Sequence, residues 1–97
     1  MNVYIRIQAA VDLIENKLKE PLTIQEIAKE AGFSPFYFQR LFQAISGFSV
    51  QSYIRKRRLS EAAKKLTQSE ERILDIAVAY QYHSQEAFTR SFARFLE

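Results

Sequence analysis

The chain repeats a pattern of apolar residues with a period close to fifty positions, and this repeat limits the folds open to it. Each copy predicts a short helix, a turn of about four residues and a second amphipathic helix, with a small residue where the two helices cross. That is the helix-turn-helix arrangement. The matched positions are Ile27 with Ile76, Ala28 with Ala77, Phe38 with Phe88, Arg40 with Arg90, and Phe42 with Phe92.

Apolar spacing and capping residues predict six helices and no convincing strand. Residues 2–19 form the first, and Thr23 with Glu26 makes a capping box for the second, which ends at Gly32. Ser34 and Pro35 begin the third, which Gly47 ends, and Ser49 begins a long fourth helix. The fifth begins at Ser69 or Arg72, and Ser84 caps the last. The stripe expected on the third helix is Phe38, Leu41, Phe42 and Ile45, and that on the last is Phe88, Phe92 and Phe95.

Bulk composition narrows the class of protein. Ninety-seven residues, of which 47% are hydrophobic and 26% charged, are typical of one globular domain. The chain has no cysteine and a single histidine, His83, so no thiolate metal site is possible and no metal or other cofactor is expected. With no nucleophile pair and no glycine-rich phosphate loop, an enzyme is not expected. No stretch is long enough to span a membrane and no signal peptide is apparent, so we expect a cytoplasmic protein.

The faces opposite the two apolar stripes carry the functional signal. On the helix after Ser34, Phe36, Arg40 and Gln43 face outward with Gln39 on the flank. An aromatic ring gains nothing in water but can pack on a thymine methyl, although Phe36 could instead fold back onto apolar neighbours. Arginine suits guanine and glutamine suits adenine, whereas a solvated polar face is the alternative. The residues expected to contact bases are Phe36, Gln39, Arg40 and Gln43 in the first copy and Gln85, Glu86, Thr89 and Arg90 in the second.

A basic run lies on the long helix between the two copies. Charge runs are usually solvated, but one placed between two recognition helices can clamp phosphates and fix the register on a duplex. The net charge of +3 agrees with a polyanionic partner without requiring one. The residues expected to contact phosphate are Arg55, Lys56, Arg57 and Arg58 in this run, and Ser34, Tyr37 and Ser84 at the recognition helices.

Three stretches together resemble the AraC/XylS family of bacterial transcription regulators, and within it the Rob, MarA and SoxS group. They are residues 22–42 (LTIQEIAKEAGFSPFYFQRLF), 53–63 (YIRKRRLSEAA) and 73–92 (ILDIAVAYQYHSQEAFTRSF). The resemblance implies an all-α fold of two homeodomain-like three-helix units, here 1–48 and 67–97, joined by a central helix over 49–66. By position it assigns base contacts to Phe36, Gln39 and Arg40 and to Gln85, Glu86 and Arg90.

Close relatives have tryptophan at the position of Phe36 and glutamine at that of Glu86, and two further features depart from the pattern of that family. Gln81 stands where glycine is common in the turn, and the chain stops at Glu97, where family members continue. We therefore expect a fragment whose missing portion is C-terminal.

The function predicted is sequence-specific binding of double-stranded DNA by a transcription regulator. The resemblance implies that the chain binds as a monomer and that its two recognition helices enter successive segments of the major groove, and we expect the Ser34 helix to dominate specificity. The resemblance favours an activator that also contacts RNA polymerase. The alternative is a helical module that docks a transcription partner and for which DNA contact is secondary.

Overall fold

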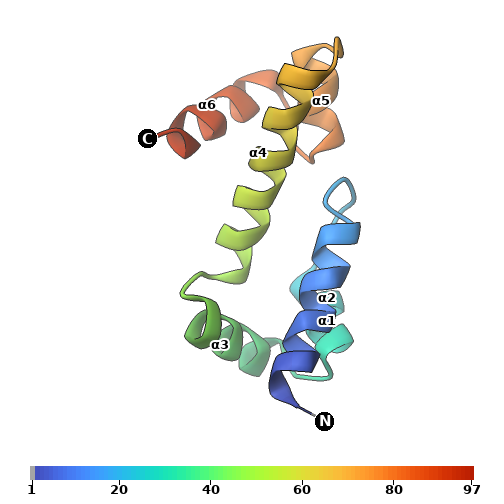
Figure 1. Cartoon of the computed structure of the whole chain (residues 1–97), viewed down its shortest axis with the longest axis vertical. Helices are drawn as coiled ribbons and strands as arrows, with labels where there is room; N and C mark the ends of the chain where they lie inside the picture. The colour runs from blue at the N-terminus through green and yellow to red at the C-terminus, as the bar shows by residue number, and fades with distance from the viewer. Residues whose placement is uncertain (1) are drawn as a thin grey trace.

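The computed structural model describes residues 2–97, so Met1, where the first predicted unit starts, lies outside it. Over this range the chain forms six α-helices and no strand, which confirms the all-α prediction (Figure 1). The helices are α1 (Val3–Asn16), α2 (Ile24–Ala31), α3 (Pro35–Ser46), α4 (Val50–Gln68), α5 (Ile73–Ala79) and α6 (Gln85–Phe95).

Side-chain caps set most of these boundaries where the sequence predicts them. The Thr23 side chain accepts a hydrogen bond from the Glu26 amide and the Glu26 carboxylate accepts one from the Thr23 amide, which completes the capping box. Ser34 and Ser84 accept from the amides of the third residue of α3 and α6. The fifth helix is the exception, because its N-cap is Arg72, which makes no side-chain cap bond.

The six helices form two three-helix units, which lie towards opposite ends of the elongated molecule (Figure 1). In the first unit α2 packs on α1 and α3, and in the second α4 packs on both α5 and α6. Because α4 also contacts α3, the central helix is at once the connection and the first helix of the second unit. Figure 1 shows α3 beside one end of α4 and α6 beside the other. The molecule measures 44 × 24 × 22 Å.

The apolar faces of both units meet in one buried cluster. Its largest fully buried side chains include Ile14, Ile27 and Phe38 from the first unit and Leu59, Ile76 and Phe88 from the second. Two residues of the predicted stripes are exposed, since Ile45 is 42% exposed and Phe95 is 37% exposed. Both lie in the last turn of their helices. Helical periodicity identifies the face of a residue, but not whether a neighbour covers that face at the end of the helix.

None of the helices over residues 2–97 combines the length and the apolar character needed to cross a bilayer.

Candidate nucleic-acid interface

The outward face of α3 is open to solvent and carries a cation beside an aromatic ring. Phe36 in the first turn is 70% exposed, and the guanidinium carbon of Arg40 lies 5.5 Å from its ring centroid. The alternative that Phe36 folds onto apolar neighbours is therefore wrong. Gln43 is exposed one turn further on, while Gln39 is half-buried and its Nε2 donates to the Pro35 carbonyl at 3.2 Å. These four residues form one surface, which we call the α3 face.

The outward face of α6 has the same place in the second unit but a different chemistry. Arg90 is exposed at the position equivalent to Arg40, and the remaining predicted contacts, Gln85, Glu86 and Thr89, are exposed as well. Glu86 lies in the first turn, where a carboxylate stabilises the helix through the exposed amides of its N-terminus. This gives Glu86 a structural reason to be acidic that is independent of any ligand. We call these four residues the α6 face.

The starts of α3 and α6 each carry a serine whose hydroxyl can bind an anion. Ser34 is exposed and Ser84 half-buried, and each already accepts an amide hydrogen bond through its side-chain oxygen, so that its hydroxyl hydrogen can still be donated. Tyr37 is 51% exposed and its ring packs edge-on against Phe33, with the centroids 5.3 Å apart. Amides at a helix N-terminus attract phosphate, so these residues lie where contact with a phosphate group is favourable.

The basic run divides into two pairs with different surroundings. Arg55 and Lys56 are exposed, and the Lys56 Nζ lies 4.2 Å from the centroid of the Phe48 ring. Arg57 and Arg58 are half-buried and hydrogen-bonded within the molecule. The four side chains therefore do not form one exposed patch. At about 100° per residue, four consecutive residues spread around a helix and cannot share one face.

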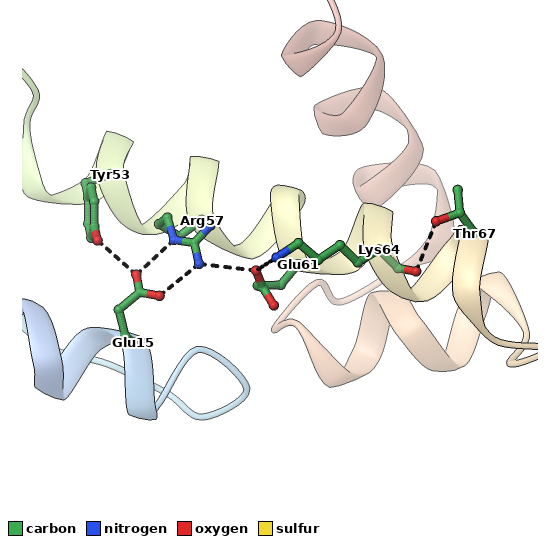
Figure 2. A network of polar contacts seen from close by, with 6 residues as sticks. All are labelled: Glu15, Tyr53, Arg57, Glu61, Lys64 and Thr67. Carbon is green, nitrogen blue, oxygen red and sulfur yellow. Dashed lines mark hydrogen bonds and ion pairs between the residues drawn. The ribbon is translucent and has the colours of Figure 1, made fainter.

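Arg57 belongs to a polar network that joins α4 to α1 (Figure 2). Its Nε and Nη2 each donate to the Glu15 carboxylate at 2.9 Å, and the Tyr53 hydroxyl donates to the same carboxylate at 2.9 Å. Glu61 accepts from Arg57 at 3.2 Å and from Lys64 at 2.9 Å.

Titration of the network residues reflects these partners. The hydrogen bond from Arg57 lowers the pKa of Glu15, although burial opposes the shift. Burial, followed by the hydrogen bond to Glu15, raises the pKa of Tyr53 to about 12. Glu15 is therefore a carboxylate and Tyr53 a neutral donor at neutral pH, which keeps the network intact.

One face of α4 connects the two recognition faces. Gln51 and Arg55 are one turn apart on it, and the Gln51 Nε2 lies 3.5 Å from the Gln39 Oε1 of α3. Arg55 and Lys56 line a surface hollow together with Ser91 and Arg94 of α6. The exposed cations Arg55 and Lys56 thus lie between the α3 face and the α6 face.

Arg94 is an exposed cation of this hollow that is not among the residues predicted from the sequence. A signal for it was present, because it follows Arg90 by four residues and so lies on the same side of its helix.

Known proteins are similar to this chain over almost its whole length. A family model described as a helix-turn-helix domain matches residues 27–97. The helix-turn-helix transcriptional regulator YbfP of Bacillus subtilis is 47% identical over 88 residues, which are 91% of this chain and 30% of that protein. The multiple antibiotic resistance protein MarA of Escherichia coli is 37% identical over 93 residues, covering 96% of this chain and 73% of that one.

A solved structure gives the same result. The crystal structure of a transcriptional regulator from Chromobacterium violaceum, described as an AraC-type DNA-binding domain-containing protein, superposes with a TM-score of 0.90. It is 28% identical and the match covers 96% of this chain and 83% of that one. The chain spans less than a third of the length of YbfP, so it corresponds to one portion of that relative.

Proposed function

This chain belongs to the AraC-type family of helix-turn-helix DNA-binding transcription regulators, and we propose that it reads two successive major-groove segments of one duplex with α3 and α6. The observation that carries the proposal is the pair of exposed recognition faces, each with an arginine at the equivalent position, joined by the cationic face of α4. Major-groove segments one helical turn apart are separated by roughly 34 Å. A molecule 44 Å long can reach both.

The α3 face supplies most of the base discrimination in this proposal. Arg40 donates in bidentate fashion to guanine, Gln39 pairs with adenine, and the Phe36 ring packs on a thymine methyl, while Gln43 reads a neighbouring base. Phe36 and Arg40 already lie beside each other, so one step of a T-G type sequence would meet both side chains.

The α6 face contributes less. Arg90 and Gln85 have the same donor chemistry as their counterparts on α3, Thr89 can bond to any base, and Glu86 accepts from the amino group of cytosine. The charge of Glu86 is repelled by the backbone phosphates, so this helix gains less from entering the groove.

Backbone contacts come from Arg55 and Lys56, assisted by Ser34, Tyr37 and Ser84 at the helix starts. Arg57 and Arg58 are assigned to folding in this scheme. If they turned to phosphate, the Glu15 carboxylate would lose its arginine and the Leu18 and Glu20 carbonyls would lose their hydrogen bonds. Arg94 is added as a further phosphate contact, since it shares a hollow with Arg55 and Lys56.

Selection of bound sites from a random pool of double-stranded DNA tests the proposal. The wild-type chain should enrich one sequence, and Arg40→Ala should cost about 1–3 kcal/mol of binding and relax preference at a single base position. Arg90→Ala should have a smaller effect of the same kind. Lys64→Ala is the matched control, because Lys64 is an exposed cation of α4 bound to Glu61. Unchanged affinity and selectivity in both arginine variants would contradict base reading by these helices.

We further propose that the chain acts as a monomer, activates transcription and contacts RNA polymerase in the cytoplasm. Two recognition helices in a single chain support monomeric binding, since no second copy is needed to reach two groove segments. Activation rests on the resemblance to activators of this family. Transcription of a template carrying the selected site, with purified polymerase and increasing amounts of the protein, should rise with occupancy of that site; a fall would assign repression instead.

A further inference from the structure

The loop between α1 and α2 is bonded to the second unit through three successive backbone carbonyls. The Arg58 Nε donates to the Leu18 carbonyl at 2.9 Å and its Nη2 donates to the Glu20 carbonyl at 2.8 Å. Between them, the Lys19 carbonyl accepts from the Gln81 Nε2 at 2.9 Å. Figure 1 shows this loop, after the end of α1, close to the turn that follows α5. We call Arg58, Gln81 and these three carbonyls the interunit contact.

The internal repeat shows what is unusual about Arg58. Its counterpart is Arg6, because the same interval separates the two arginines and the buried residues that follow them, Ile7 with Leu59 and Ala10 with Ala62. Arg6 serves its own unit, donating to the Ala31 and Gly32 carbonyls and lying with its guanidinium carbon 3.9 Å from the Phe33 ring. Arg58 instead donates to the other unit. The same element of the repeat therefore closes a turn in the first copy and joins two copies in the second.

Gln81, like Arg58, differs from its counterpart in the first copy and bonds to the opposite unit. Its φ is +73°, in the left-handed region, and the equivalent residue of the first copy is Gly32 with a φ of +78°. Glycine adopts this conformation without strain and glutamine does not. The amide group that glutamine adds is the donor to the Lys19 carbonyl. The chain thus has a less favourable turn residue whose side chain contacts the opposite unit.

Near α5 the two units also meet through Lys19, whose Nζ lies 5.6 Å from the centroid of the Tyr80 ring. The Glu15 network fixes α1 to the first half of α4, and α3 contacts the start of α4. The helices α5 and α6 carry the α6 face, and the interunit contact links their turn directly to the first unit. A change of angle between the units would move α6 relative to α3. Because the molecule is elongated, a small change of angle gives a large displacement of α6.

We propose that Arg58 and Gln81 are positioning residues that fix the separation and phase of the two recognition helices, and so set which spacing between the two DNA segments the chain accepts. The proposal rests on the proposed reading of DNA by α3 and α6. Each added base pair moves the second segment by about 3.4 Å and rotates it by roughly 35°, so a fixed pair of helices fits one spacing only.

The mechanical half of the proposal is tested without DNA. The chain has no cysteine, so Ala44→Cys on α3 and Ala93→Cys on α6 give a clean pair of spin-label sites, both exposed. Pulsed electron-electron distance measurement should give a narrow distribution in this background. Adding Gln81→Gly, which keeps the left-handed turn, or Arg58→Met, which keeps an apolar stem, should broaden it by about twofold. Arg6→Met removes the same donors inside one unit and should leave the width unchanged. An unchanged width in the Gln81→Gly variant overturns the proposal.

The specificity half uses the selected DNA site with one or two base pairs inserted between its two segments. The wild-type chain should lose about tenfold or more in affinity for the altered spacings, and the combined Arg58→Met, Gln81→Gly variant should lose only about threefold. Equal penalties in the two proteins overturn the assignment of spacing to these residues. A wild-type chain that selects no DNA contradicts the proposed function instead, and the distance measurement still decides whether the interunit contact holds the units.

Discussion

At the scale of single residues, two phenylalanines on α3 have opposite surroundings although only one residue separates them. Phe36 is 70% exposed and packs beside Arg40, whereas Phe38 is fully buried and contacts Phe42. One ring is available to a ligand and the other holds the fold. Substitution at the two positions should therefore separate binding from stability.

Phe36→Ala should change the free energy of unfolding by less than about 0.5 kcal/mol, because little apolar surface is lost from the core. It should nevertheless weaken binding to the selected DNA site, with the loss concentrated at one thymine. Phe38→Ala is the matched variant and should cost about 3–5 kcal/mol of stability. Urea denaturation and DNA titration of both variants measure the two quantities. A large loss of stability in Phe36→Ala would mean that this ring serves the fold.

At the scale of elements, the contact between α1 and α4 depends on a carboxylate. Bonding to Arg57 lowers the pKa of Glu15 below its ordinary value of 4.5. A carboxyl whose pKa is depressed in the folded state stabilises the protein above the pKa of the unfolded chain and loses that contribution as pH falls. The contribution of Glu15 should thus be complete at neutral pH and should decline below about pH 4.5.

Glu15→Gln tests this element-scale contact. The variant should be less stable at pH 7 by about 1 kcal/mol, since the carboxylate is partly exposed, and its stability should fall less steeply from pH 5 to pH 3 than that of the wild type. Thermal melts across this range give the comparison, with Glu70→Gln as an exposed control. Parallel pH curves for the wild type and Glu15→Gln would contradict the role of this ion pair.

The sequence predicts elements better than the contacts between them. Caps such as Thr23 and Ser34 act within a few residues, so local pattern locates α2 and α3 correctly. The partners of Arg57 and Arg58 lie about forty positions away in the chain, and a basic run contains no information about them. The sequence shows Gln81 as an unusual turn residue, but the bond of Gln81 to Lys19 crosses sixty-two positions and depends on the angle between the units. The base contacts assigned to the α3 and α6 faces stay predictions.

At the scale of the whole molecule, the exposed cations between the two faces should make DNA binding depend on salt. Each phosphate neutralised contributes roughly −0.9 to the slope of log K against log salt concentration. Arg55→Ala and Lys56→Ala should each reduce the magnitude of that slope by about 1 while leaving the preferred sequence unaltered. Fluorescence anisotropy titrations at four or five salt concentrations measure the slope.

Lys64→Ala again provides the control, because it removes an equal charge from the same helix on the side where Glu61 lies. Its slope should match that of the wild type. If Lys64→Ala reduced the slope as much as Lys56→Ala, binding would reflect overall charge and not a surface between α3 and α6.

The two units follow each other in one chain and differ at the positions that face outward. Phe36, Gln39 and Arg40 have no identical trio on α6, where Gln85, Glu86 and Arg90 stand. No twofold axis relates the units, unlike the two halves of a symmetric dimer, which favour palindromic operators. A site bound by this molecule therefore has a direction. Inverting such a site relative to a promoter would reverse the orientation of the bound protein. A neighbouring protein on the DNA would then face α5 where it had faced α2.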